Sequence, residues 1–175
     1  MRRRILKLPL KRRRLEKTDY RMRKRLISSG RPRAVVRRSL TGIYVQIIEY
    51  DPKGDRVICA SSSHDLKPFN WKYKGDTTPA AYLVGYLAGK KALSKGISSC
   101  ILDIGVYSPS RGARVFSVVK GLIDAGVEVP HSDEVLPDES RIYGEHISKE
   151  IRPEVMRIKD EIDKHEHGAE VKTDE

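Results

Sequence analysis

The chain has 175 residues, of which 38% are hydrophobic and 34% charged, proportions that fit one globular domain with an appended segment. Its net charge of +11 favours a polyanionic partner, either nucleic acid or an anionic membrane surface. No apolar run approaches the roughly 18 residues that span a bilayer, and two cysteines within apolar runs are too few for a disulfide framework. We therefore expect a soluble, intracellular protein.

The positive charge is concentrated at the start of the sequence. Residues 1–38 contain 17 Lys and Arg against two acidic residues, Glu16 and Asp19, a net charge of +15. Since the whole chain carries +11, residues 39–175 carry −4. Apolar residues are few in this region, so residues 1–30 are predicted to form a basic arm that is ordered chiefly by its partner. A removable targeting leader would not need to continue its basic run through Arg38 into the first strand, as this one does.

One stretch of the arm has helical character. Residues 19–30, "DYRMRKRLISSG", predict about two helical turns, which Asp19 or Thr18 caps and Gly30 ends. Eight Lys and Arg and no acid lie between residues 20 and 39. The arm therefore delivers an unbalanced positive charge directly to the edge of the folded region.

Three segments after the arm have the composition of β-strands. Residues 33–39, 42–50 and 56–63 are rich in β-branched and aromatic side chains, and short turns separate them. Such a sequence predicts an antiparallel meander. Alternation within residues 42–50 predicts one buried face and one more polar face, with Tyr44 on the polar one.

Two helices and a fourth strand complete the predicted core. Thr78 is the expected cap of a helix that Pro79 begins, and residues 98–107 predict a buried strand. A second amphipathic helix follows, with an inward face formed by Val115, Val118, Val119 and Leu122. The order β-β-β-α-β-α, with a crossover helix between the third and fourth strands, predicts an α/β fold with a mixed sheet and helices against it. Gly85 and Gly89 lie one turn apart in the first helix and permit close backbone approach.

The sequence divides into three parts: the arm (1–30), an α/β core domain (31–130) and a C-terminal loop with a helical tail (131–175). The last 31 residues hold ten acidic against six basic residues and few apolar ones. This composition predicts a tail helix that is exposed to solvent or docked on a partner.

Catalytic alternatives have weaker support in the sequence. Asp103 lies in an apolar strand, with Asp124, Glu128 and Asp133 downstream, so a metal-dependent nuclease is the alternative function. The segment "SSSHD" (61–65) resembles a triad, but adjacent residues rarely form one, and we expect a loop. Metal binding by "HEH" (165–167) is unfavoured, because histidines at i and i+2 point apart on a helix. No glycine-rich phosphate loop is present.

Nucleic acid is a better partner for the arm than a membrane. In residues 1–38 Arg outnumbers Lys by 13 to 4, and guanidinium groups bind phosphates in a bidentate manner and stack on bases. A membrane-binding helix would need aromatic anchors, and the only aromatic residue of the arm is Tyr20. The arm lies beside a predicted half-open sheet that bears Tyr44 and Tyr50, with Trp71 and Tyr73 in a nearby loop. This arrangement favours folded RNA, whose loops offer bases for stacking. A DNA-coating, histone-like protein remains a third possibility.

Several long segments resemble a known family. "YRMRKRLISSGRPRAVVRRS", "YVQIIEYDPKGD", "TPAAYLVGYLAGKKALSKGI", "ILDIGVYSPSRGARVFSVVKGLIDAGVEVPHS" and "RIYGEHI" occur in this order. They closely resemble the archaeal form of the universal large-subunit ribosomal protein eighteen family, whose eukaryotic counterpart is ribosomal protein five. The resemblance covers about residues 15–148, and the tail beyond it is shorter and more acidic than the extensions of the family.

The resemblance implies a ribonuclease-H-like α/β domain without catalytic function or cofactor. It implies a structural protein of the cytoplasmic ribosome that attaches 5S rRNA to 23S rRNA in the central protuberance, beside universal large-subunit ribosomal protein five and archaeal neighbours. Together with the composition of the arm, it predicts RNA contacts at Arg12, Arg13, Arg14, Arg21, Arg23, Lys24, Arg25, Arg31, Arg33, Arg37, Arg38, Tyr44, Trp71, Lys72, Tyr73, Arg111 and Arg114.

Overall fold

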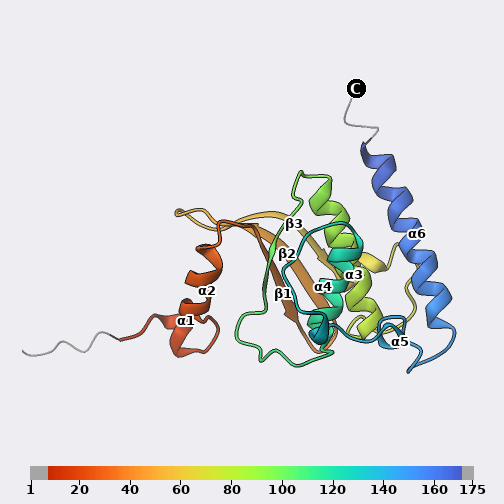
Figure 1. Ribbon diagram of the computed structural model, residues 1–175, viewed down its shortest axis with the longest axis horizontal. Coiled ribbons are helices and arrows are strands. Elements are labelled where there is room, and N and C mark those ends of the chain that lie inside the picture. Colours follow the sequence, from red (N-terminus) through yellow and green to blue (C-terminus); the bar gives the residue numbers. More distant parts are fainter. Residues whose placement is uncertain (1–7, 171–175) are drawn as a thin grey trace, which may run out of the picture.

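The computed structural model describes residues 8–170, with side chains through residue 165. A four-stranded sheet lies at the centre, two helices cover one of its faces, and a long C-terminal helix lies outside them (Figure 1). The two short helices of the basic arm lie at the opposite end of the molecule from the C-terminal helix (Figure 1). Residues 1–7 of the predicted arm lie outside the described residues.

The sheet contains the predicted meander and one crossover strand. Its order is β3-β2-β1-β4, and the strands are β1 (Arg33–Arg38), β2 (Ile43–Glu49), β3 (Arg56–Ser62) and β4 (Ile101–Asp103). The β1–β2 and β2–β3 pairs are antiparallel, while β1 and β4 are parallel, because the chain returns through a helix. The predicted mixed α/β architecture and element order are confirmed.

The fourth strand is shorter than predicted. Residues 98–107 were expected to be extended, but only Ile101–Asp103 pair in the sheet, and Ser99 makes an isolated bridge to Glu128. The chain turns at Gly105, which has a φ of +69°, and the Gly105 amide donates to the Asp103 carboxylate at 2.9 Å. A left-handed residue ends a strand, so this turn accounts for the difference.

Helices α3 (Thr78–Leu93) and α4 (Arg114–Asp124) pack with their backbones in close contact. The cap of α3 is Thr77 and not the predicted Thr78, because the Thr77 hydroxyl accepts from the Ala80 amide. A Cβ atom at Gly85 would lie 2.3 Å from the carbonyl oxygen of Val118, and one at Gly121 would lie 2.2 Å from that of Tyr82. The close approach predicted for Gly85 and Gly89 is confirmed.

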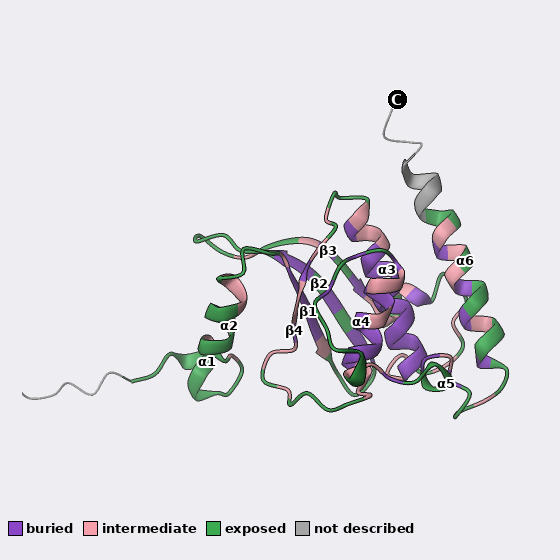
Figure 2. Ribbon diagram, in the orientation of Figure 1, coloured by how far each residue is buried: buried purple, intermediate pink, exposed green. Residues whose placement is uncertain are grey.

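The C-terminal helix is part of the core, contrary to the predicted exposed or partner-docked tail. Helix α5 (Glu139–Ile142) leads to α6 (Ile151–Glu170), which packs against α3. Four apolar residues at helical spacing are fully buried along one stripe of α6: Ile151, Val155, Ile158 and Ile162. They are few, but their spacing of four, three and four residues places them on one face. Figure 2 shows this buried stripe along the inner side of α6.

The face of α3 beneath α6 contains Tyr82 and Tyr86, which are 0% and 2% exposed. The Tyr86 hydroxyl donates to Asp163 of α6 at 2.7 Å, and Lys90 pairs with the same carboxylate at 2.8 Å. Burial, together with this hydrogen bond, raises the pKa of Tyr86. Both cysteines are buried, and burial raises the pKa of Cys100 to about 12. Short 3₁₀ turns span Ser63–Leu66 and Asp133–Val135.

We predict that Gly121→Ala destabilises the protein. Alanine has the higher helix propensity, by about 1 kcal/mol, so the substitution would stabilise an isolated helix. Here its methyl group meets the Tyr82 carbonyl, and the expected loss is about 2 kcal/mol in the free energy of unfolding. Urea denaturation followed by circular dichroism measures this loss. A stabilised variant would contradict the close contact of α3 and α4.

We also predict that acid weakens the docking of α6. Partial burial opposes ionisation of Asp163, but the bonds from Lys90 and Tyr86 outweigh it, so the pKa of this carboxyl is lowered. A lowered pKa in the folded state contributes stability above the ordinary value, about 4, and this stability is lost as the pH falls through the folded value. Asp163→Asn should therefore lose stability at pH 7 and depend less on pH below about 4. The exposed residue Asp160 supplies the matched control, Asp160→Asn, and equal urea midpoints for the two variants would contradict this prediction.

Candidate nucleic-acid interface

The basic arm forms two short helices, α1 (Lys11–Arg14) and α2 (Tyr20–Ile27). Asp19 caps α2, since its carboxylate accepts from the amides of Arg21 and Met22 at 2.9 and 3.2 Å. Gly30, with a φ of +69°, follows the helix end. The predicted helix is confirmed, and the cap is Asp19 rather than Thr18. Thr18 instead accepts from the Arg12 side chain at 2.9 Å.

Most of the predicted phosphate-binding residues of the arm are exposed and lack an ion-pair partner within the described part of the chain. On α2, Lys24 and Arg25 follow Arg21 by three and four positions, so the three side chains lie on one face of the helix. In Figure 2 the exposed residues of both helices are green, and α2 also contains half-buried residues, which are pink. The exposed residues of this set are Arg12, Arg13, Arg14, Arg21, Lys24 and Arg25. They present a row of cations to solvent.

Two further predicted contacts lie at the margin of the arm and have weak partners. Arg31 is exposed, with its guanidinium 3.5 Å from the exposed carboxylate of Glu128. Arg38 is exposed at the end of β1, and its guanidinium lies 5.0 Å from the ring centroid of Tyr107. Exposed pairs of this kind contribute little, about 0–1 kcal/mol, so both guanidinium groups remain available to a polyanion.

Three of the predicted RNA contacts form ion pairs within the protein. Arg33 is only 3% exposed, and its guanidinium donates to Asp55 at 2.6 Å and to Asp103 at 2.9 Å. Arg23 donates to both oxygens of Asp55 at 2.8 Å. Arg37 donates to the Asp103 carboxylate at 3.1 Å and to its backbone oxygen at 2.8 Å. Charge counting along the sequence could not separate these three from their exposed neighbours.

The carboxylates proposed for a nuclease do not converge. Asp103 is occupied by Arg33, Arg37 and the Gly105 amide. Asp124, at the end of α4, accepts from the Tyr82 hydroxyl at 2.8 Å and pairs with Lys120 at 3.0 Å. Among the described residues, no group of three or more His, Cys, Asp and Glu could hold a metal ion. The carboxylate cluster considered from the sequence is therefore wrong.

The "SSSHD" segment has a structural role, as expected for a loop. Ser62 and Asp65 form a capping box at the 3₁₀ turn, with the Ser62 hydroxyl donating to Asp65 at 3.1 Å. The Ser63 hydroxyl donates to the Gly75 carbonyl at 2.6 Å and accepts from the Ile43 amide at 2.9 Å. His165 packs edge-on against Phe69, while the side chain of His167 lies outside the described residues.

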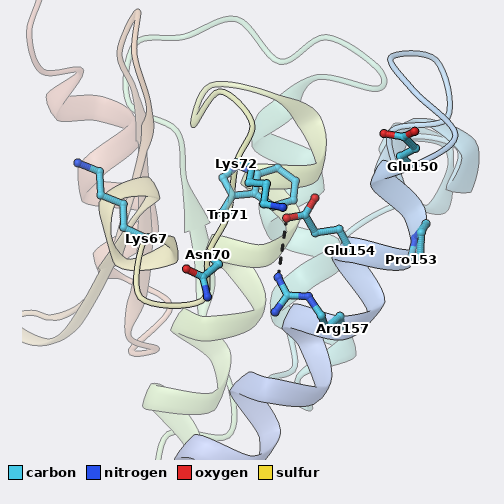
Figure 3. A pocket seen from close by; sticks show the side chains of 8 residues that line it. All are labelled: Lys67, Asn70, Trp71, Lys72, Glu150, Pro153, Glu154 and Arg157. Carbon is cyan, nitrogen blue, oxygen red and sulfur yellow. Dashed lines mark ion pairs between the residues drawn. The ribbon is translucent and has the colours of Figure 1, made fainter.

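Two of the three predicted aromatic contacts pack against each other. Trp71 and Tyr73 are half-buried, and their rings meet edge-on with centroids 5.2 Å apart. Tyr44 of β2 is 41% exposed. Trp71 and the exposed Lys72 line a groove of about 750 Å³ against α6, whose other lining residues are Lys67, Asn70, Glu150, Pro153, Glu154 and Arg157. Figure 3 shows the side chain of Glu154 extending from α6 toward the loop. Since α6 lies at the far end from α1 and α2, this groove and the arm are two separate surfaces (Figure 1).

The remaining candidates, Arg111 and Arg114, lie near the start of α4. The Arg111 side chain is 78% exposed, with its guanidinium 3.1 Å from Glu134. Arg114 donates to the backbone oxygen of Asp76 at 2.5 Å and lies 3.3 Å from its carboxylate. Arg111 is accessible, whereas Arg114 connects α4 to the loop before α3.

Comparison with known proteins decides the family. Residues 4–98 and 94–132 match the family described as "Ribosomal large subunit proteins 60S L5, and 50S L18". The chain belongs to this family. It is 51% identical over 144 residues to "Large ribosomal subunit protein uL18" of Aeropyrum pernix, covering 82% of this chain and 67% of the relative. Proteins of the same name from Thermofilum pendens and Korarchaeum cryptofilum are 46% and 48% identical, over 87% and 81% of this chain and 81% and 73% of theirs.

Membership in the L5/L18 family identifies the chain as a structural constituent of the large ribosomal subunit and not an enzyme. Its location is that of the ribosome, in the cytoplasm. Within residues 8–170, no helix combines the length and the apolar content needed to cross a bilayer. The resemblance noted from the sequence motifs is confirmed.

Matched substitutions in this L5/L18 protein distinguish an arginine that stabilises the fold through buried ion pairs from one that is exposed to solvent. Arg33→Gln should lower the free energy of unfolding by about 3–5 kcal/mol, because it leaves Asp55 and Asp103 without their shared buried partner. Arg31→Gln, two residues away and exposed, should change it by less than about 0.5 kcal/mol. Urea denaturation of both variants checks this, and equal stabilities would show that the buried pairs are dispensable.

Proposed function

We propose that the protein binds 5S rRNA through its basic arm and attaches it to 23S rRNA in the central protuberance of the large subunit. The observation that carries the proposal is the row of exposed cations on α1 and α2, none of them ion-paired within the described residues, beside a body of mildly acidic composition. Phosphates of a folded RNA supply the anions that this surface lacks.

The arrangement of α2 supports a phosphate-binding role. Its outward face bears Arg21, Lys24 and Arg25, while Arg23 turns toward the body and pairs with Asp55. Residues on one helical face can follow an RNA backbone, and such contacts fix the register of the protein without reading sequence. In this proposal residues 1–30 form the RNA-binding arm, which Arg31 and Arg38 extend.

Attachment of one RNA to another requires a second surface. The groove between the Trp71–Tyr73 loop and α6 lies at the opposite end of the molecule. Its charged lining residues are three cations, Lys67, Lys72 and Arg157, and two carboxylates, Glu150 and Glu154. We propose that this end, together with Arg111, faces 23S rRNA. Universal large-subunit ribosomal protein five is proposed as a neighbour on the basis of the family alone.

The arm is tested by the salt dependence of RNA binding. With about eight phosphate contacts, the logarithm of the affinity for 5S rRNA should fall against the logarithm of salt concentration with a slope of about −5 to −7. Arg21→Gln with Arg25→Gln should reduce the size of that slope by about 1.5, the share of two contacts. Filter binding at several KCl concentrations measures both slopes.

The matched control removes two exposed positive charges far from the arm, by Arg141→Gln with Lys149→Gln. This pair should leave the slope unchanged. Equal reductions in the two double variants would show that net charge, rather than the arm, determines the affinity. Competition by duplex DNA as strong as that by 5S rRNA would favour a DNA-coating protein instead.

A further inference from the structure

The orientation of the arm depends on a cluster of five charged side chains. Arg23 comes from α2, Arg33 and Arg37 from β1, Asp55 from the turn before β3, and Asp103 from the end of β4. The two carboxylates alternate with the three guanidinium groups. Within the described residues, the pair of Arg23 and Asp55 is the one ion pair between α2 and the folded body.

Apolar packing holds α2 only in part. None of its residues is fully buried: Tyr20, Leu26 and Ile27 are half-buried, and Met22 is 46% exposed. A pocket of about 130 Å³ lies between the arm and the sheet, and its lining includes the charged residues Arg23, Arg33, Arg37, Asp55 and Asp103 and the apolar residues Met22, Leu26, Val35 and Ile48. Because no apolar residue of α2 is fully enclosed, its polar contacts contribute to its position.

Asp55 is a fixed partner for Arg23 because Arg33 holds it. The same oxygen of Asp55 accepts from Arg33 at 2.6 Å and lies 2.8 Å from the guanidinium of Arg23. Arg33 is itself fixed on its other side by Asp103 and is 3% exposed. The anchoring carboxylate is therefore held by the sheet through contacts that do not involve α2.

We propose that Asp55 is a positioning residue for RNA binding: it contacts no RNA but, through Arg23, holds α2 so that Arg21, Lys24 and Arg25 face outward as one row. This inference rests on the proposed binding of RNA by the arm. A helix held in its binding orientation loses less conformational freedom when it binds, so the anchor increases affinity.

The proposal predicts a change in RNA affinity opposite in sign to the change expected from simple electrostatics. Removal of an acidic group near a phosphate-binding surface reduces repulsion of the polyanion and should strengthen binding. If Asp55 acts by positioning, its removal weakens binding instead. The two effects therefore predict opposite changes for the same substitution.

The experiment compares Asp55→Asn with Asp51→Asn. Both residues lie in the turn between β2 and β3, and both substitutions remove one negative charge. Asp51 differs from Asp55 in that it is exposed and pairs with no cation within the described residues. Asp55→Asn should weaken the binding of 5S rRNA by about tenfold, the equivalent of one or two side chains that must be ordered on binding. Asp51→Asn should leave the affinity unchanged or slightly higher, and Asp55→Glu should restore part of the loss.

A double-mutant cycle with Arg23→Gln shows whether Asp55 acts through Arg23. In the Arg23→Gln background, Asp55→Asn should have little further effect on affinity, since the contact is already broken. Arg23→Gln leaves the pairs of Arg33 intact, so it tests the anchor even if Asp55→Asn fails to fold. Additive losses in the cycle would overturn the proposal, as would tighter binding by Asp55→Asn or equal behaviour of Asp55→Asn and Asp51→Asn.

Hydrogen exchange of the protein without RNA tests the anchor separately. Amides of residues 20–27 should exchange faster in Arg23→Gln and Asp55→Asn than in Asp51→Asn. Sheet amides at residues 43–49 should keep their original exchange rate in Arg23→Gln, which leaves the buried pairs of Arg33 intact. Unchanged exchange at residues 20–27 would overturn the inference. If the original protein failed to bind 5S rRNA, the proposed function would fail, and the exchange comparison would still decide whether Asp55 holds α2.

Discussion

The buried guanidinium of Arg33 is the interaction on which the arrangement of this protein depends. A charge that is 3% exposed is tolerated only when it is paired, and Arg33 has two carboxylates, Asp55 and Asp103, on either side of it. Those carboxylates come from the two outer parts of the sheet, beside β3 and at the end of β4. The same ion pairs fix the ends of the strands and provide the carboxylate to which the arm is attached.

Arginine has two physical roles within a short stretch of this chain. The exposed cations of α1 and α2 repel one another in water, and in the proposed function the phosphates of the RNA relieve that repulsion. Arg23, Arg33 and Arg37 are already paired with carboxylates of the protein. The family makes this chain a structural constituent of the large ribosomal subunit, and the proposed task of its arm is to hold RNA in a fixed geometry.

The rigid part of the molecule is centred on α3, which is buried on almost every side. Glycines at positions 85 and 121 allow α3 and α4 to touch backbone to backbone, and α6 covers the remaining face with its four buried aliphatic residues. Because α6 packs on α3, the groove beside Trp71 is part of the packed core and lies at the opposite end of the molecule from the arm. The proposed joining of two RNAs requires two separated surfaces of this kind.

From the sequence we could predict the order of the strands and helices, the close approach at Gly85, the helix after Asp19 and the family, because these depend on local periodicity, on turn residues and on long continuous motifs. The sequence did not show that Arg33 is enclosed, that Asp103 pairs with arginines and not with a metal, or that the acidic tail completes the core. Each of these depends on residues far apart in the chain, such as Arg33 and Asp103, which only the parallel pairing of β1 and β4 brings together. Likewise, the four apolar residues of the charged helix α6 are buried only because α6 packs against α3. The sequence of α6 alone does not reveal this contact.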